Sequence, residues 1–468
     1  MTIKSLRDKH SSLVYKEYHY QINKNQLEIS FKFLLKPNIT FEPLLIIENI
    51  DQAKLEAIPK PILENLIFHL GLAELPSYWK CACPNTIKIE AGSLNSDQIA
   101  WWKSLFKHGL GEFYYINKID FTEKKFLNIE ALPQEEKLQN INSPPESHFQ
   151  KPYLLPIGGG KDSGLALSLF DQHQLNYGCM VLHPASPAAP ALIQASRSQE
   201  TINIQRTIDP ILLKLNDQGY LNGHTPFSAY LAFLNTLIAY IFGYQQILIA
   251  NESSANQANL EYKDLKINHQ YSKSFNFEQK FRSYSQDYLH TSKKQAEYLS
   301  FLRPLNELQI SQLFSQYSKF LPIFKSCNVG QKQNQWCHRC SKCLFVYMML
   351  YPFVDKATLT NQIFDHDLYS DEELFSTASS LVGLSDHKPL ECVGTELEAI
   401  AACLLAIKKH EKQSQELPIL LKKIQNQVLN KFDPEEISDL PYKMLSGWDY
   451  NNFLDRKLGK IIKSALKN

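Results

Sequence analysis

The run Gly158-Gly159-Gly160 is the feature that most constrains how this 468-residue chain can fold. A short apolar segment, 153–157, precedes the glycines, and a segment with helical spacing of apolar residues follows them. Glycines between a strand and a helix let the backbone approach a ligand closely and adopt positive φ. Such a helix directs its unpaired N–H groups and the positive end of its dipole into the turn, where Lys161 adds a mobile positive charge and Ser163 a hydroxyl donor. The sequence therefore predicts a phosphate-binding turn in an α/β fold.

The residues after the glycines distinguish this turn from other phosphate loops. The order Gly-Gly-Gly-Lys-Asp-Ser over 158–163 matches neither the Walker A spacing nor the Gly-x-Gly-x-x-Gly dinucleotide turn. An ordinary strand-to-helix turn is the alternative, but Lys-Asp-Ser directly after the glycines favours a nucleotide. The order resembles the pyrophosphate loop of the ATP pyrophosphatases, Ser-Gly-Gly-x-Asp-Ser, enzymes that split ATP into AMP and pyrophosphate. Gly158 stands where those enzymes have serine.

Composition and charge exclude several classes of protein. The formal net charge is +1, from 49 basic and 48 acidic residues, so there is no global electrostatic reason to expect a nucleic-acid or membrane partner. The first residues lack the apolar core of a signal peptide, and the longest apolar pattern, 227–242, is too short and too mixed to span a bilayer. Nine cysteines, three of them in one Cys-x-x-Cys-x-x-Cys run, favour a reducing compartment and a metal over disulfides. We expect a soluble, cytoplasmic protein.

Shifts in composition divide the chain into four parts. Residues 1–132 contain alternating apolar segments on both sides of Asn23-Lys24-Asn25, so we expect an N-terminal α+β domain that begins with a β-hairpin. The proline- and charge-rich stretch 133–152 is typical of a linker. In 153–355 strands alternate with helices, which predicts a doubly wound parallel sheet of the ATP-pyrophosphatase (PP-loop) type. Residues 356–468 have helical patterns, so we expect a helical C-terminal region.

Polar residues follow several of the predicted strands and indicate one shared cleft. Asp209, Asn251 and Glu252 follow later strands, as the glycine turn follows the first. Ligands of open α/β sheets bind at the carboxyl ends of the strands. Two polar loops that contain histidine, 222–227 and 268–274, flank the cleft and offer phosphate contacts or acid/base groups. A purely structural role for these histidines is an equally good interpretation.

Four cysteines near residue 340 have the spacing of a metal-binding knuckle. They are Cys327, Cys337, Cys340 and Cys343, in the order Cys-x9-Cys-x2-Cys-x2-Cys. Three thiolates on one tight turn and a fourth from the preceding loop can close a tetrahedral zinc site. That zinc would be structural, because four protein ligands leave no open position. An iron–sulfur cluster uses the same ligands, and unliganded thiols are the third option.

A loop near the C-terminal region carries Glu391 and Cys392. The pattern Thr395-x-x-Glu398 is a capping box, so a helix is expected to begin directly after this loop. A helix N-terminus lowers the pKa of a nearby thiol, although a packed, inert thiol is the more ordinary interpretation. A second capping box is predicted over 370–373.

Two families carry these motifs in the same order. From the glycine turn to Cys343 the chain resembles 7-cyano-7-deazaguanine synthase, which has a pyrophosphate loop, a Pro-Leu…Glu-Ile helix (here 304–310) and a zinc knuckle. That enzyme is a single small domain, so it leaves 1–145 and 356–468 unexplained. Over nearly its whole length the chain resembles the ATP-dependent UDP-N-acetyl-α-D-muramoyl-L-alanyl-L-glutamate epimerase family. The strings that carry this resemblance are 156–163, 222–227, 251–253, 268–274, 336–343 and 388–395.

The second resemblance implies an enzyme that inverts the terminal L-Glu of the peptidoglycan precursor UDP-MurNAc-L-Ala-L-Glu to D-Glu. It further implies ATP and Mg²⁺ as cofactors and AMP and pyrophosphate as products. Removing the Cα proton beside a free carboxylate would place a second negative charge on an anion. An acyl-adenylate at the α-carboxyl has a neutral carbonyl that can accept this charge, which favours the α- over the γ-carboxyl.

The resemblance also implies roles for single residues. Gly158, Gly159, Gly160 and Ser163 would hold the phosphates, Lys161 would neutralise developing charge, Asp162 would help to bind Mg²⁺, and Asn251 and Glu252 would line the adenylate site. Inversion needs one group on each face of the carbon, and the candidates are His224, His269, Tyr271, Lys273 and Cys392. An ATP pyrophosphatase that modifies a nucleobase or tRNA, an amidating enzyme and a nucleotide-sensing module are the rival classes. The balanced charge argues against the RNA-modifying class.

Overall fold

The structure is a computed structural model that describes residues 1–468 except 134–143, 145, 291–295, 386, 428 and 468. Its strands are β1 (Ser12–Asn23), β2 (Gln26–Leu35), β3 (Ile39–Phe41), β4 (Leu44–Ile47), β5 (Thr86–Ser93), β6 (Asn128–Leu132), β7 (Lys151–Pro156), β8 (Tyr177–His183), β9 (Thr201–Thr207), β10 (Tyr244–Ile249), β11 (Leu260–Tyr262), β12 (Leu265–Ile267) and β13 (Glu297–Ser300). Its α-helices are α1 (Ile3–Lys9), α2 (Gln52–Glu56), α3 (Lys60–Trp79), α4 (Ser96–Gly109), α5 (Gly111–Ile116), α6 (Lys161–Gln172), α7 (Ala188–Gln194), α8 (Pro210–Asp217), α9 (Phe227–Phe242), α10 (Phe275–Tyr288), α11 (Glu307–Phe314), α12 (Ser341–Leu350), α13 (Lys356–Thr358), α14 (Phe375–Leu381), α15 (Glu396–Gln413), α16 (Ile419–Gln427), α17 (Pro434–Ser438), α18 (Leu440–Ser446) and α19 (Arg456–Ala465). Most of the predicted linker, 133–152, lies outside the described residues.

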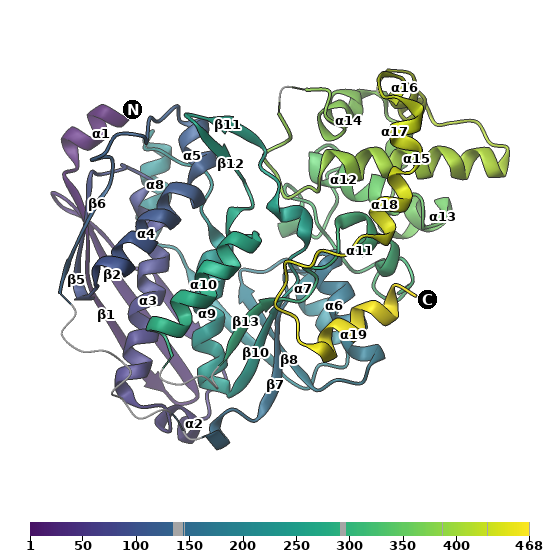
Figure 1. Ribbon diagram of the computed structural model, residues 1–468. Helices are drawn as coiled ribbons and strands as arrows, with labels where there is room; N and C mark the ends of the chain where they lie inside the picture. Colours follow the sequence, from purple (N-terminus) through teal and green to yellow (C-terminus); the bar gives the residue numbers. More distant parts are fainter. Residues whose placement is uncertain (134–143, 145, 291–295, 386, 428, 468) are drawn as a thin grey trace.

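One mostly parallel sheet connects the N-terminal and central parts of the chain (Figure 1). Within the described residues it has eleven strands in the order β13-β10-β7-β8-β9-β4-β2-β1-β5-β6, with β3 paired to β2. The two parts join where β4 pairs antiparallel with β9, with Leu44 opposite Thr207 and Ile47 opposite Ile204. Residues predicted to form a separate N-terminal domain therefore extend the sheet of the central part.

The first hairpin has the predicted turn. β1 and β2 pair antiparallel, and Asn23 lies opposite Gln26. Lys24 in the turn has φ 56°, a left-handed conformation that short hairpin turns require. Alternate residues of β2 are buried, as the period of the sequence indicates.

The strand order reverses at β7. The chain proceeds from β7 to β8 and β9 on one side and then returns to place β10 and β13 on the other, and all these neighbours are parallel. Helices cover both faces: Leu154 of β7 belongs to the core that contains α9, and its neighbour Leu155 to the core that contains α6. The loops after β7 and β10 therefore lie side by side at a topological switch point, where α/β sheets bind ligands.

α9 is the apolar helix predicted before Gly243. Gly243 ends it with φ 77°, the left-handed conformation that favours glycine at this position. Inside the helix, the side chains of Asn235 and Thr236 donate to the carbonyls of Leu231 and Ala232. In the part of the chain that the structure describes, none of the helices combines the length and the apolar character needed to cross a membrane.

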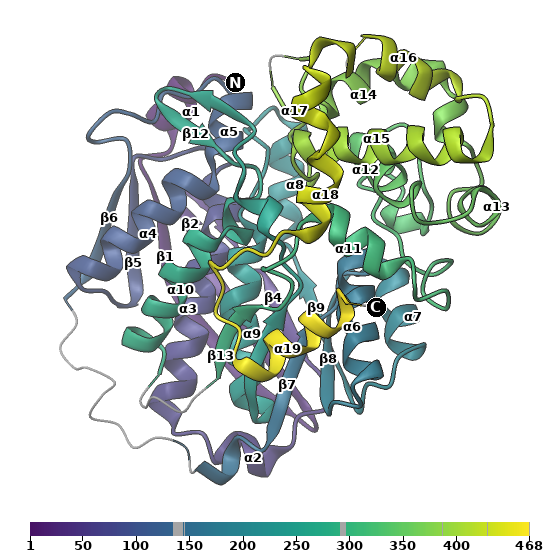
Figure 2. The ribbon, with the colours of Figure 1, turned by 45° about the vertical axis from the view of Figure 1, so that its right-hand side comes forward.

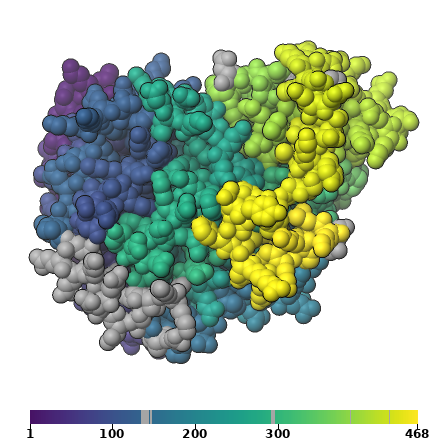
Figure 3. Space-filling view, viewed as in Figure 1, coloured from purple at the N-terminus to yellow at the C-terminus, as the bar shows by residue number. Residues whose placement is uncertain are grey.

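The C-terminal region is helical, as predicted, and α12 to α18 form a cluster beside the sheet (Figure 2). The segment after α18 then runs back across the central part, as the yellow atoms in Figure 3 show. Its helix α19 packs on α6. The capping box at Thr395 and Glu398 is confirmed. The box predicted over 370–373 is wrong: this segment forms short 3₁₀ turns, because Ser370 donates its hydroxyl to Asp367 and does not cap a helix.

Candidate functional site

The glycine turn joins β7 to α6 and is shaped to admit an anion. Gly159 has φ 91°, and a Cβ there would lie 3.0 Å from the backbone nitrogen of Ala189, so this position requires glycine. Gly160 precedes α6, and no described side chain caps that helix, which leaves its first N–H groups available to a ligand. A Cβ at Gly158 would meet no described atom within 4 Å. The turn therefore has open space beside the helix N-terminus.

Lys161 is held in place and is not the mobile charge that the motif predicts. Its side chain is 1% exposed, and its Nζ bonds the carboxylates of Asp162 and Glu307. Burial acts to lower the pKa of Lys161, but the two carboxylates raise it well above its usual value. For Asp162, burial is outweighed by Lys161, Lys342 and Lys273, which lower the pKa of the carboxyl. The charged groups beside the glycine turn, Lys161, Asp162 and Glu307, are thus held in fixed positions by one another.

Glu307 is a site residue that the sequence reasoning missed. It is the first residue of α11, and its N–H donates to the carboxylate of Glu398 at 2.6 Å. Its own carboxylate lies 4.0 Å from Nζ of Lys342. The only local signal was an acidic residue directly after a helix-capping Asn306, a pattern that is common at helix starts.

The loop after β10 contributes a buried acid. Glu252 is 2% exposed, and its Oε2 has no hydrogen-bond partner among the described residues. Burial, opposed by Lys273 and Lys161 and reinforced by Glu307 and Asp162, raises the pKa of Glu252 to about 7. A buried carboxyl oxygen without a partner is unfavourable unless a ligand or cation completes it. Asn251, beside it, donates to the hydroxyl of Ser300 at 3.2 Å.

Arg303 holds this loop against the turn that carries Lys273. Its guanidinium is 0% exposed and donates to the carbonyls of Glu252 and Lys273, and it pairs with Glu278 at 3.0 Å. A guanidinium offers five donors in a fixed plane, which suits it to join several acceptors. Glu252 and Lys273 are therefore positioned relative to one another by a single buried side chain.

Cys392 lies among three cationic groups. Burial acts to raise the pKa of its thiol, but Lys273, a hydrogen bond from His269, and Lys342 together lower it to about 6. The ammonium group of Lys342 also donates a hydrogen bond to the carbonyl of Cys392, and the backbone N–H of Lys342 donates one to the carboxylate of Glu391 at 2.8 Å. The cysteine is a thiolate at neutral pH, and its loop is anchored to α12.

His269 bridges Cys392 and an acid from the N-terminal part of the chain. Its Nδ1 bonds the carboxylate of Glu112, in α5. Burial acts to lower the pKa of His269, but the bonds with Cys392 and Glu112 raise it to about 9. His224 lies 3.7 Å from the same carboxylate, with its ring centroid 4.5 Å from that of His269. Burial, His269 and Lys80 lower the pKa of His224 to about 3, so His224 is neutral and His269 is charged.

Most of the predicted site residues converge in this structure. Hydrogen bonds, a ring contact and electrostatic interactions connect the following residues into one set: Lys161, Asp162, Glu252, His224, His269, Lys273 and Cys392. Tyr271 instead stacks on His108, with ring centroids 5.2 Å apart. Asp209 uses its carboxylate to accept N–H bonds from Ile211 and Glu42, so its role is structural.

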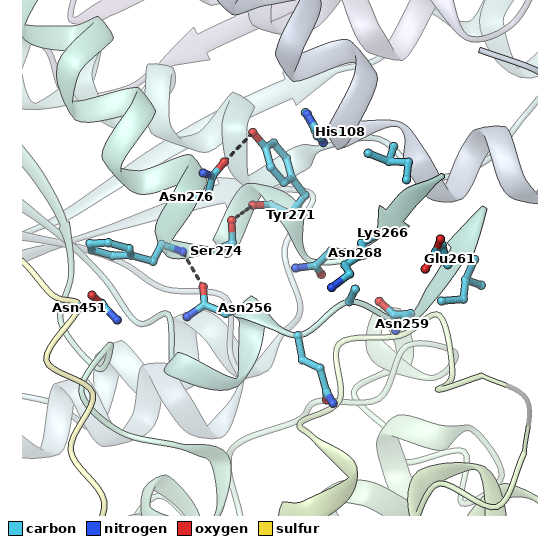
Figure 4. Close-up of a pocket in the computed structure, with 15 residues that line it drawn as sticks. His108, Asn256, Asn259, Glu261, Lys266, Asn268, Tyr271, Ser274, Asn276 and Asn451 are labelled. Atoms are coloured by element: carbon cyan, nitrogen blue, oxygen red, sulfur yellow. Dashed lines mark hydrogen bonds between the residues drawn. The ribbon is translucent and has the colours of Figure 1, made fainter. Parts of the chain in front are cut away.

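Figure 4 shows a pocket of about 880 Å³ whose lining includes Asn268 and Ser274, the chain neighbours of His269 and Lys273. Amide side chains dominate its lining, together with Tyr271, Lys266 and Glu261. Asn259, at one wall, donates to the carbonyl of Pro389 at 2.7 Å and accepts from the N–H of His269 at 2.9 Å. The pocket and the Cys392 loop therefore share a wall.

The four cysteines of the predicted knuckle come together. The sulfur atoms of Cys327, Cys337, Cys340 and Cys343 lie within 4.8 Å of one another. Two of the separations are 3.8 Å, from Cys337 to Cys343, and 3.4 Å, from Cys340 to Cys343. Zn–S bonds of about 2.3 Å in a tetrahedron require sulfur atoms roughly 3.8 Å apart. Backbone N–H groups also donate to the sulfurs, as Gly330 does to Cys327 at 3.0 Å, so the donor set suits a metal that binds four thiolates.

The knuckle is mechanically connected to the site. Cys340 caps α12, and Lys342 lies in the first turn of that helix. Any displacement of the knuckle would therefore move Lys342, which contacts both Glu307 and the Cys392 loop.

The fold and the site together define an α/β protein with an anion-binding turn beside a buried acid–base cluster. Comparison with known families gives a narrower assignment. The family model described as the MurL N-terminal domain matches residues 4–301, and the MurL C-terminal domain matches residues 323–436. The chain belongs to the MurL family.

Two curated relatives show the same likeness. The chain is 31% identical to the UDP-N-acetyl-alpha-D-muramoyl-L-alanyl-L-glutamate epimerase of Xanthomonas oryzae pv. oryzae, over 79% of this chain and 80% of that protein. It is 29% identical to the protein of the same name from a Micromonospora species, over 74% of each chain. The epimerase family expected from the motifs is confirmed.

Proposed function

We propose that the protein is an epimerase that inverts the terminal L-Glu of UDP-MurNAc-L-Ala-L-Glu, with ATP converted to AMP and pyrophosphate. The names of the relatives support the reaction. The observation that carries the ATP step is the uncapped glycine turn beside the fixed charges of Lys161 and Asp162.

Activation of the carboxylate explains why an epimerase would need such a turn. A carboxylate resists loss of the neighbouring Cα proton, because the product would carry two adjacent negative charges. An acyl-adenylate removes the first charge. Preorganised N–H groups and cations lower the barrier most where they face the charge that develops in the transition state. Here that charge develops on the departing pyrophosphate and on the acyl oxygen.

The turn would hold the pyrophosphate of ATP. The N–H groups of Gly159, Gly160 and the first turn of α6 would face its oxygens. The hydroxyl of Ser163, which accepts from the N–H of Gly158 at 3.2 Å, would be a further donor, and Gly158 would leave room for the phosphate. Asp162 and Glu252 supply the hard oxygen ligands that Mg²⁺ prefers, and the ion would neutralise charge on the phosphates. Asn251 would line the adenylate site.

Inversion requires an acceptor on one face of Cα and a donor on the other. We assign these roles to His269 and Lys273, because both interact with the same thiolate, His269 by a hydrogen bond and Lys273 electrostatically. Both are also positioned by a buried partner, His269 by Glu112 and Lys273 by Arg303. His224 packs against His269 and would support it.

The pocket in Figure 4 would hold the nucleotide-sugar part of the substrate. Its amide lining suits hydroxyl and carbonyl groups, and Lys266 offers a charge for a diphosphate. Its shared wall with the Cys392 loop would place the peptide end of the precursor near the acid–base cluster.

We further propose that the four thiols of the knuckle hold a structural zinc ion. Bound zinc would fix the start of α12 and so the position of Lys342. An iron–sulfur cluster on the same thiols would give a coloured protein, which distinguishes the two.

An end-point assay tests the proposed function. The protein is incubated with UDP-MurNAc-L-Ala-L-Glu, ATP and Mg²⁺, and the glutamate released by hydrolysis is resolved into enantiomers. We expect D-Glu and AMP to form together, and neither to form with UDP-MurNAc-L-Ala. AMP without D-Glu, or neither product, would refute the proposal.

A further inference from the structure

Cys392, His269 and Glu112 form a relay, a chain of three interacting side chains. Inversion by proton transfer would not by itself need all three. The Cys392 thiol bonds His269, and Nδ1 of His269 bonds Glu112. A nucleophile, an imidazole and a carboxylate that orients the imidazole form the arrangement that activates thiols and hydroxyls for attack on acyl groups. Lys273 and Lys342 add positive charge beside the thiol.

The relay is connected to the glycine turn. Lys273 and Lys342 interact with Cys392 and also with Asp162, the second residue of α6. The two ammonium groups are therefore within electrostatic range of both the thiol and the start of α6. Cationic groups at this position would also stabilise the oxyanion formed when a thiolate adds to a carbonyl.

From this arrangement we propose that Cys392 takes the glutamyl group from the acyl-adenylate, so that the α-carbon is inverted as an enzyme-bound thioester. This inference rests on the proposed function. A thioester suits inversion, because sulfur donates little electron density to the carbonyl and the neighbouring Cα–H is correspondingly acidic. The covalent bond also holds the substrate while its configuration changes.

The steps balance without a further reactant. The thiolate sulfur attacks the acyl carbon, a C–S bond forms, the C–O bond to phosphate breaks, and AMP leaves with the electron pair. A proton leaves Cα and another returns to the opposite face. Water then adds to the carbonyl, and the C–S bond breaks to regenerate the thiolate and the free carboxylate. Of the water's two protons, His269 takes one and the other goes to solvent.

Acylation would also change the protonation of His269. The negative thiolate is one of the two groups that raise the pKa of His269, and the thioester carries no such charge. The imidazolium would then release its proton to solvent and become a base, at the stage when a base is needed near Cα. Glu112 would keep the ring oriented throughout and acts as a positioning residue.

The test compares the wild-type enzyme with Cys392→Ala and the nearly isosteric Cys392→Ser. Cys403→Ala is the control, because Cys403 is a buried thiol on α15 outside the relay. Substrate-dependent exchange of pyrophosphate into ATP measures adenylation. A single turnover with enzyme in excess and precursor labelled in its glutamate, quenched with acid, measures label bound to protein, its release by hydroxylamine, and AMP.

We expect protein-bound label to rise and fall in the wild-type and in Cys403→Ala, to be released by hydroxylamine, and to map to the peptide that contains Cys392. In Cys392→Ala, exchange should persist within about threefold of the wild-type rate, because adenylation does not use the thiol. AMP release and inversion should both fall by about 10⁴-fold or more, as on removal of a catalytic nucleophile. Cys392→Ser should either behave as the alanine variant or retain label as a stable ester.

Two results would overturn the thioester. One is normal exchange and inversion in the wild-type with no protein-bound label at any time. The other is a Cys392→Ala variant that still releases AMP at the wild-type rate without inversion, which would make the cysteine a proton carrier only. Absence of exchange in every protein would instead refute the proposed adenylation, so the two failures are distinguishable.

Discussion

Cys392 and His269 titrate as a pair, and this pair sets the pH range of the site. The thiol faces Lys273, Lys342 and His269, and the imidazole faces Cys392, Glu112 and His224. The cations lower the pKa of the thiol to about 6, and the anions raise that of the imidazole to about 9. Thiolate and imidazolium therefore coexist between these values.

The first prediction concerns kcat/KM as a function of pH. Activity should fall as the pH decreases through about 6, because the thiolate is protonated, and fall again as the pH increases through about 9, because the acylation step uses the charged form of His269 before that ring releases its proton and acts as a base. Glu112→Gln removes an anion that raises the pKa of His269, so the alkaline limb should move to lower pH. Glu64→Gln, in an exposed pair with Lys60, is the control and should leave the profile unchanged. An alkaline limb that stays in place in Glu112→Gln would contradict this account.

The second prediction uses the open space at Gly158. An added methyl group meets no described atom there, so Gly158→Ala should leave the free energy of unfolding unchanged. It should raise KM for ATP by about tenfold, equivalent to about 1.4 kcal/mol, since the methyl group would occupy space meant for phosphate. Gly459→Ala is the matched control, because a Cβ at that position also meets no described atom within 4 Å. Equal KM values for the two variants would remove the turn from ATP binding.

At the scale of single elements, α12 connects the thiol knuckle to the site. Cys340 caps the helix, and Lys342 follows within its first turn. Because the knuckle cysteines Cys340 and Cys343 flank Lys342, the position of this first turn depends on what fixes the knuckle. A structural zinc in a Cys₄ site contributes on the order of 10–16 kcal/mol of apparent binding free energy.

The third prediction follows from that dependence. The purified protein should contain one zinc ion per chain by elemental analysis. Cys337→Ala should lose the metal, and its unfolding temperature should fall by about 10 °C or more, because several kcal/mol of stability are lost. Cys403→Ala, also a buried thiol, should keep the metal. Protein without stoichiometric metal, or with iron, would contradict a zinc site.

The hairpin β11–β12 forms one side of the pocket and supports the fourth prediction. Lys266 on β12 is exposed and lines the pocket, and Lys263, in the turn of the same hairpin, pairs with Asp120 at 3.1 Å. Lys266→Ala should raise KM for the precursor by about threefold to tenfold with kcat retained, because an exposed charge contributes about 1 kcal/mol to binding. Lys263→Ala should change neither. A fall in kcat alone would argue that the sugar-diphosphate binds elsewhere.

At the scale of the whole molecule, the continuous sheet brings distant parts of the chain to one site. Local patterns predicted the glycine turn, the parallel strands and the thiol knuckle, since each depends on a few neighbouring residues. Glu112 could not be predicted in this way. Glu112 belongs to the N-terminal part of the chain, which joins the central part where β4 pairs with β9. The strand residues that pair there are about 160 positions apart in the sequence, and so are Glu112 and His269.

Glu307 and Lys342 were missed for a related reason. Each lies in the first turn of a helix, where acidic and basic residues usually face solvent, and only the packing of α11 and α12 shows that both side chains are buried. Lys161 was recognised, but its pairing with Glu307 made it a fixed charge. Sequence patterns thus identified most of the reactive side chains of the site, but not the charged partners that fix their positions and shift their pKa values.

The central claim is that ATP activates the glutamyl carboxylate so that its α-proton can exchange. The most direct test is turnover of UDP-MurNAc-L-Ala-L-Glu in heavy water, with and without ATP, followed by mass analysis of the separated glutamate enantiomers. We expect deuterium at the α-position of the D-Glu product, and neither deuterium nor inversion when ATP is omitted. D-Glu that forms without ATP, or that carries no solvent deuterium, would contradict the account.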